Sequence, residues 1–216
     1  MTGMETYFPE VRSFLNERDP SEHNFRMLCE LLVTALHEMH DHAAYALVPY
    51  VDGMLRRWPG RLRKMPHRWL GHVGSKPPWH VSILQPLMRS ILISDREFSP
   101  PDLAALLDGE LFKPITHLAI RDIRYEPNPA FREPLRILLE SDSLLQLEAL
   151  TLARFVGGER GYQMLAQCER VRGIRELSLR HGICFGISAL AASEHLENLR
   201  TLDLGYVYCG MAMGRN

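Results

Sequence analysis

The sequence lacks the cysteine patterns that organise small disulfide-rich domains. Its 216 residues contain no CxxC pair, and the cysteines are widely spaced: Cys29, Cys168, Cys184 and Cys209. Long apolar runs are also lacking, since the most apolar early run, LLVTAL at 31–36, is far too short to span a bilayer. The first twenty residues are polar and lack the apolar core of a signal peptide. These absences predict a protein of a reducing, cytoplasmic compartment without a membrane span.

Acidic side chains are missing from residues 53–94, which carry eight lysines and arginines. Residues 1–52 show the opposite balance, with nine acids against three arginines. The net charge of −1 therefore hides two segments of opposite sign. With 46% hydrophobic and 24% charged residues, the chain has enough apolar side chains to bury a core, which excludes global disorder.

Residues 1–98 are predicted to form an all-α domain that caps the region after it. One apolar stripe recurs at steps of three and four residues, as on one face of a helix: Phe25, Leu28, Leu32, Leu36 and Met39. Prolines interrupt 58–80, and 81–92 is predicted to be helical again. The segment 99–109, SPPDLAALLDG, is predicted to be a capped helix.

A different pattern begins after residue 110. Four segments read apolar-x-x-Leu-x-apolar: ITHLAI at 115–120, LEALTL at 147–152, IRELSL at 174–179 and LRTLDL at 199–204. Their central leucines, Leu118, Leu150, Leu177 and Leu202, are separated by 32, 27 and 25 residues, with helix-compatible stretches between them. Such units bury their leucines only when they stack on one another.

This pattern resembles the leucine-rich repeat superfamily, nearest the long-repeat, ribonuclease-inhibitor-like type, and HLENLRTLDLG at 195–205 is close to its bacterial members. The resemblance covers roughly residues 100–216. It implies an α/β solenoid of about four repeats over 99–216, with parallel strands on the concave side and helices on the convex side.

Strand alternation places the residues between the leucines on the concave face. Its middle column, Ala119, Thr151, Ser178 and Asp203, is small. The predicted binding residues flank or belong to this floor: Arg121, Arg154, Arg180, His181, Asp203 and Tyr206. Arginine and tyrosine are typical interface anchors. The sequence therefore favours a non-catalytic module that binds another protein, while a solvated sheet face without a partner stays open as the alternative.

A second binding hypothesis concerns residues 56–80, where basic side chains are interleaved with all three tryptophans, Trp58, Trp69 and Trp79. Such a segment could bind nucleic acid or an anionic surface. The alternative interpretation is structural. In it, the tryptophans pack between the two regions and the arginines pair with the acidic N-terminal helices.

An enzymatic alternative comes from HEMHDH at 37–42, in which His37, His40 and Asp41 could hold a metal. A zincin needs H-E-x-x-H, because histidines four residues apart converge on one metal. Position 41 is aspartate, so the motif fails and an exposed helix face is the better interpretation. We expect no catalytic residues, no metal and no cofactor.

The C-terminal sequence GYVYCGMAMGRN is apolar and too short for another helix and strand. An open repeat end exposes its leucines and an unpaired strand edge. Either the sequence is a piece of a longer repeat protein or another subunit covers this end. In the second case we expect a two-fold dimer through residues 187–213.

Overall fold

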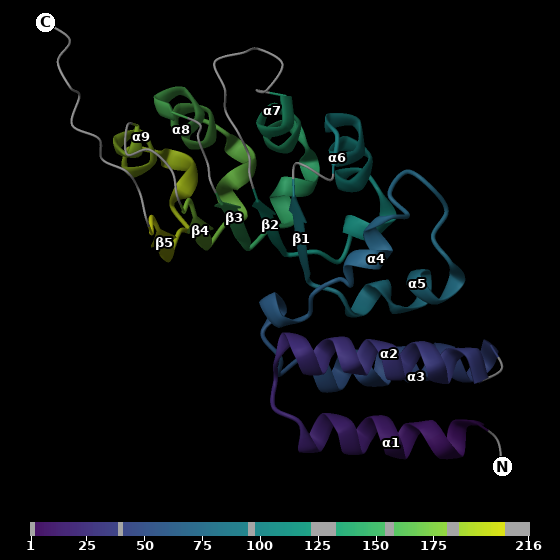
Figure 1. The fold of residues 1–216 in the computed structure, drawn as a ribbon. Coiled ribbons are helices and arrows are strands. Elements are labelled where there is room, and N and C mark those ends of the chain that lie inside the picture. Colours follow the sequence, from purple (N-terminus) through teal and green to yellow (C-terminus); the bar gives the residue numbers. More distant parts are fainter. Residues whose placement is uncertain are drawn as a thin grey trace, which may run out of the picture. The chain divides into compact units, whose positions relative to one another are not determined.

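The computed structural model describes residues 3–38, 41–94, 98–121, 133–153, 158–180 and 186–205, with side chains from Tyr7 onward in the first helix and from Ala46 onward in the third. The chain divides into two compact units, Met1–Ile91 and Leu92–Asn216. Figure 1 shows the helices of the first unit in purple and blue and the sheet of the second in teal to yellow. Among the described residues, no helix is long and apolar enough to cross a membrane.

The first unit is built from helices. Their bounds are Gly3–Glu17 (α1), Glu22–Glu38 (α2), Asp41–Leu55 (α3), His67–Leu70 (α4) and Trp79–Leu84 (α5), with 3-10 turns at Gly60–Leu62 (η1) and Gln85–Leu87 (η2). The predicted stripe of α2 is confirmed, since Phe25, Leu28, Leu32 and Leu36 are all buried. Helix α1 packs against α2 and α3, and α5 packs against the same two helices.

A buried ion pair ties the basic segment to the acidic helices inside this unit. Arg63 is only 4% exposed, and its Nε donates a 2.8 Å hydrogen bond to the Leu87 carbonyl. Its Nη2 lies 2.5 Å from Asp52 Oδ1 of α3. Arg89 donates to the same carboxylate oxygen. Burial lowers the pKa of Arg63, and the hydrogen bond to Asp52 opposes that shift only in part. These partners compensate the cost of removing the guanidinium from water.

The second unit contains most of a parallel sheet whose strands follow one another in chain order, β1-β2-β3-β4-β5. The strands are Ser90–Ser94, His117–Arg121, Ala149–Ala153, Glu176–Ser178 and Thr201–Asp203. Between them run helices Pro100–Leu107 (α6), Glu133–Glu140 (α7), Gly158–Ala166 (α8) and Ile187–Ala191 (α9). Each is followed by a 3-10 segment: Glu110–Phe112 (η3), Asp142–Gln146 (η5), Glu169–Gly173 (η6) and Glu194–Leu196 (η7). The protein is thus a mixed α/β structure.

The prediction that 81–92 is helical and that residues 1–98 are all-α is wrong, because strand β1 lies at Ser90–Ser94. The helix ends at Leu84, and the 3-10 turn that follows contains Pro86, which has no N–H to continue a helix. In SILIS, Ile91 and Ile93 alternate with half-buried or polar neighbours, the period of a strand. Backbone pairing on both sides then favours the strand conformation. Ser90 forms a β-bridge with Lys64, and β1 lies beside β2 in the sheet.

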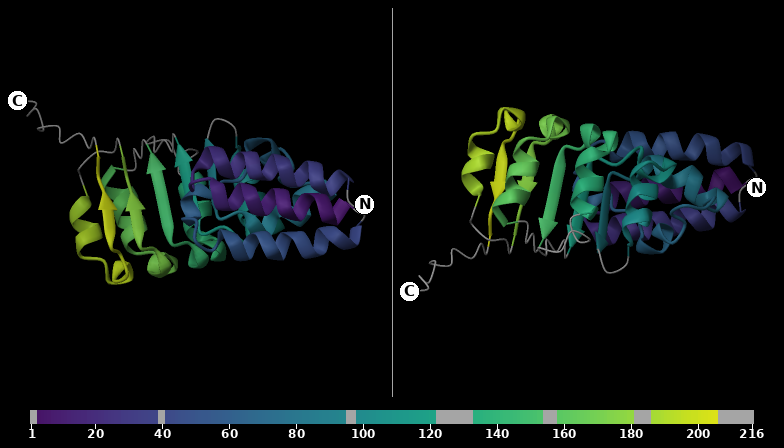
Figure 2. Two further views of the ribbon diagram at one scale, coloured as in Figure 1. Left: turned by 90° about the horizontal axis from the view of Figure 1, so that it is seen from below. Right: turned by 90° about the horizontal axis from the view of Figure 1, so that it is seen from above.

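The leucines occupy the predicted register. Leu118 pairs with Leu150, Leu150 with Leu177, and Leu177 with Leu202. Alternate side chains in β2 and β3 are buried, and the helices α6 to α9 lie along that buried face of the sheet (Figures 1 and 2). The predicted helix over 99–109 is also confirmed, because α6 begins after Ser99, which forms a capping box with Asp102.

The burial of the ridge leucines changes abruptly at β5. Leu118, Leu150 and Leu177 are at most 2% exposed, whereas Leu202 is 41% exposed. In the described part of the chain β5 is the last strand in the order, so Leu202 has a leucine beside it only on the β4 side. The exposed ridge expected at this end is therefore present. The dimer through 187–213 stays a prediction, and residues 206–213 lie outside the described chain.

Candidate functional site

The face of the sheet opposite α6 to α9 is lined by small side chains at its centre. Ala119 pairs with Thr151, Thr151 with Ser178, and Ser178 with Asp203, and each of these residues is half-buried. In the second unit, no described helix covers this side of the strands (Figure 2). We call this surface the open face. The middle column therefore lies where the sequence predicted it.

Two predicted binding residues, Arg180 and Asp203, contact each other. The Arg180 Nε donates to Asp203 Oδ2 over 2.6 Å, and the Ser178 hydroxyl donates to the same oxygen over 3.3 Å. The second oxygen, Oδ1, accepts a 2.9 Å bond from the backbone N–H of Gly205. The Gly205 bond, followed by the bond from Arg180, lowers the pKa of Asp203. This carboxylate therefore joins β4 to β5, and both its oxygens are engaged without a partner protein.

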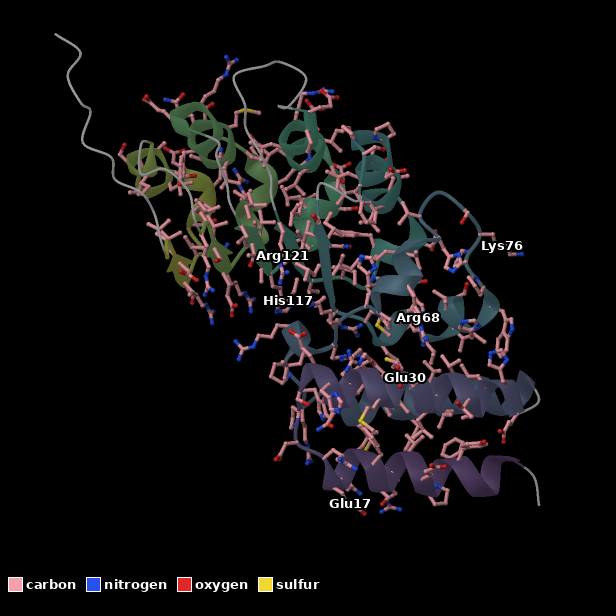
Figure 3. The ribbon with its side chains drawn as sticks, in the orientation of Figure 1. Glu17, Glu30, Arg68, Lys76, His117 and Arg121 are labelled. Atoms are coloured by element: carbon pink, nitrogen blue, oxygen red, sulfur yellow. The ribbon has the colours of Figure 1, made fainter. Side chains whose placement is uncertain are left out.

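Arg121 differs from Arg180, because its guanidinium has no hydrogen bond or ion pair among the described residues. It is exposed at the end of β2, four residues after His117 on the same face of the strand (both labelled in Figure 3). His117 Nδ1 lies 2.9 Å from the Thr116 hydroxyl. The other predicted binding residues, Arg154, His181 and Tyr206, lie outside the described residues. Among the predicted binding residues that the structure describes, Arg121 is therefore the arginine without a described partner, and its guanidinium can bind a ligand.

Two arginines at the start of the strands were missed by the sequence reasoning. Arg175 directly precedes β4 and Arg200 directly precedes β5, and both are exposed. Neither guanidinium has a partner within the described part of the chain. The signal was available, because the two arginines stand 25 residues apart at the same position relative to Leu177 and Leu202. Together with Arg121 they add positive charge to both ends of the strands.

Part of the basic segment 56–80 is engaged within the first unit. Trp58 is 6% exposed and Trp69 2% exposed, so neither offers a free ring for a base to stack on. Arg63 bonds to Asp52, and Lys64 lies 3.4 Å from Glu22 of α2. The structural interpretation expects such pairs, and these two of the segment's cations form them. Arg68 on α4 and Lys76 before α5 stay exposed (Figure 3).

His37, at the end of α2, packs against two aromatic rings of α5. Its ring lies edge-on to Trp79, with centroids 5.3 Å apart, and 5.4 Å from the ring of His80. Burial, followed by the proximity of His37, Arg68 and His72, lowers the pKa of His80. Within the described residues, no group of three or more His, Cys, Asp or Glu side chains is placed to hold a metal ion. His40 and the side chain of Asp41 lie outside the described part.

The failed H-E-x-x-H spacing predicts that no stoichiometric zinc co-purifies with the protein. We expect elemental analysis of the purified chain to give well under one zinc per molecule, since two histidines alone hold zinc weakly. A His37→Ala and His40→Ala double variant should then have the same metal content as the wild type. One tightly held metal per chain that disappears in the double variant would instead support the enzymatic alternative.

No protein-family model, no curated protein and no solved structure matches this chain.

Proposed function

We propose that residues 99–216 form a leucine-rich repeat solenoid that recognises another protein through the open face and has no catalytic role. The strand order supports this proposal, because each strand lies beside the one before it in the chain. Five successive segments run helix, 3-10 turn, strand: α5-η2-β1, α6-η3-β2, α7-η5-β3, α8-η6-β4 and α9-η7-β5. This is one segment more than the four leucine motifs indicate.

Recurring hydrogen bonds support the same interpretation. At four places two consecutive N–H groups donate to one carbonyl in the preceding segment. The donors and acceptors are Arg89 and Ser90 to Arg63, Glu148 and Ala149 to Thr116, Arg175 and Glu176 to Glu148, and Arg200 and Thr201 to Arg175. Side-chain amides repeat as well. Gln146 bonds the Phe112 carbonyl and Asn198 the Arg172 carbonyl, and each amide stands four residues before its ridge leucine.

Side chains at or next to the start of the 3-10 segments bond to the helices of the preceding segment. Ser143 Oγ donates to the Leu107 carbonyl over 2.6 Å, and Cys168 Sγ donates to the Leu139 carbonyl over 3.3 Å. Ser193 Oγ donates to the Ala166 carbonyl in the same manner. These carbonyls lie at helix C-termini, where backbone acceptors have no partner within the helix. Contacts between each segment and its neighbour alone are typical of stacked repeats.

Binding at the open face is supported above all by its floor of small side chains. A column that runs Ala119, Thr151, Ser178 leaves room for another chain to approach the sheet closely, and Arg121, which has no partner among the described residues, stands on the same face at the end of β2. Arginine at such a rim forms bidentate bonds with carboxylates of a partner.

Thr151→Arg tests this proposal, because a long side chain at the centre of the floor blocks close approach. Immobilised wild-type protein is expected to capture a partner from native lysate, and Thr151→Arg to retain at least tenfold less of it. Gln163→Arg on the exposed face of α8 provides the matched control and should capture as much as the wild type. Circular dichroism would establish that both variants are folded. Equal capture by the wild type and Thr151→Arg would exclude the open face as the binding surface.

A further inference from the structure

Two adjoining cavities lie between α1 and α3 in the first unit, and Arg57 and Trp58 at the start of the basic segment line the larger one. The larger has a volume of about 610 Å³ and the smaller about 450 Å³. Both are lined by Arg12, Asn16 and Tyr50, so they form one continuous groove. The larger volume alone lies within the roughly 300–1,000 Å³ typical of small-molecule sites.

The groove follows from the residue spacing on its two helices. On α1 the lining residues Phe8, Arg12 and Asn16 recur every four positions, which places them on one side of the helix. On α3 and just after it, Tyr50, Gly53 and Arg57 recur at steps of three and four and face the groove from the other side. A Cβ added at Gly53 would meet no atom within 4 Å. Gly53 therefore leaves open the space that a larger side chain would fill.

The charged side chains among the described residues that line this groove are both arginines. Arg12 and Arg57 both border the larger cavity, and neither guanidinium has a hydrogen bond or ion pair among the described residues. None of the described residues that line the two cavities is acidic. The acid beside Gly53, Asp52, is already bonded to Arg63, and Glu17 of α1 accepts a hydrogen bond from Ser13. Arg12 comes from the acidic N-terminal part, residues 1–52, and Arg57 from the basic part that follows it in the sequence.

The smaller cavity adds an aromatic half. Phe8, Pro9 and Tyr50 line it, and the rings of Phe8 and Tyr50 pack with centroids 5.5 Å apart. A planar ring can pack against such a pair, while the amide of Asn16 can donate to or accept from its polar edge. One end of the groove thus suits an anion and the other suits a flat, largely apolar group.

We propose that the groove binds a small organic anion in which a phosphate adjoins a planar ring, the chemistry of a mononucleotide. Guanidinium groups match phosphate oxygens with paired hydrogen bonds, so Arg12 and Arg57 hold the phosphate between α1 and α3. The ring lies along Tyr50 toward Phe8. This site is independent of the open face and of the protein partner proposed there.

Isothermal titration of the full chain with adenosine monophosphate tests the site. We expect saturable binding, with adenosine alone and inorganic phosphate alone at least tenfold weaker, because each occupies only one half of the groove. Arg12→Gln and Arg57→Gln should each weaken the nucleotide at least tenfold. Arg56→Gln, an exposed neighbour that does not line the cavities, should change the affinity less than twofold.

Gly53→Leu separates ligand binding from folding. Leucine is a better helix former than glycine and extends into the open space, so the melting temperature should stay the same or rise while nucleotide binding is lost. The proposal is overturned if adenosine monophosphate does not bind at millimolar concentration. It is equally overturned if Arg56→Gln weakens binding as much as Arg57→Gln, or if Gly53→Leu binds like the wild type.

Discussion

Leu177→Asp is expected to abolish the cooperative unfolding transition of the second unit. Leu177 is 1% exposed and sits between Leu150 and Leu202 in the ridge. Removing a buried leucine costs about 2–5 kcal/mol, and burying a carboxylate without a partner adds to that cost. The sum reaches the total stability of many domains, about 5–15 kcal/mol. Thermal melting followed by circular dichroism would show the loss of this transition.

Leu145→Asp makes the same chemical change at an exposed position and provides the control. Leu145 lies on η5 and is 56% exposed, so its replacement should alter the free energy of unfolding by no more than about 0.5 kcal/mol. If Leu177→Asp melted like the wild type, the assignment of Leu177 to a buried ridge would be wrong. If both variants unfolded, the effect would reflect added charge and not the site of burial.

Gly186→Ala should lower the free energy of unfolding by about 2–4 kcal/mol, from backbone strain together with overpacking. Gly186 precedes α9 and has a φ of +101°, a conformation that side chains with a Cβ rarely adopt. An added Cβ would also lie 2.7 Å from the Cα of Glu159 and 3.0 Å from the Cβ of Tyr162. Both atoms belong to α8, so the substitution would push the two helices apart. Chemical denaturation of the variant measures the loss.

Gly158→Ala separates the two causes. Gly158 also has a positive φ, +53°, but an added Cβ meets no atom within 4 Å. Only the conformational cost of about 1–2 kcal/mol remains at this position. An equal loss in the two variants would mean that contact between α8 and α9 at Gly186 contributes nothing beyond backbone strain.

The register of the sheet could be predicted from the sequence, because a leucine stands at the fully buried position of each of the strands β2, β3 and β4. Leu118, Leu150 and Leu177 each begin a Leu-x-apolar pair that only a stacked strand can bury. Strand β1 escaped this reasoning, since Ile91 and Ile93 stand in the run SILI, and a short apolar run fits a helix as well as a strand. Its conformation depends on pairing with residues distant in the chain, which a local pattern does not contain.

The candidate sites were less predictable for a related reason. Alternation placed Arg180 and Asp203 on one face, but their ion pair runs diagonally between strands and depends on twist and rotamer. The tryptophans of 56–80 fit a surface motif as well as a packed core in the sequence, and the packing of the helices buries Trp58 and Trp69. The groove lined by Arg12 and Arg57 required knowing that α1 lies against α3. Hydrophobic periodicity predicts which face of a helix is buried. It does not predict which other helix packs against that face.

The order of strands β2 to β5 also bears on how the chain folds. Paired ridge leucines are 32, 27 and 25 residues apart, and the described backbone pairs of β2 to β5 join only strands that are consecutive in the chain. Loop-closure entropy grows with the separation of the contacting residues, so each strand pair forms with only a local entropic cost. During synthesis, β2 and β3 can pair before β5 has left the ribosome. The sheet then grows by one strand at a time, with the newest leucine ridge always at its edge.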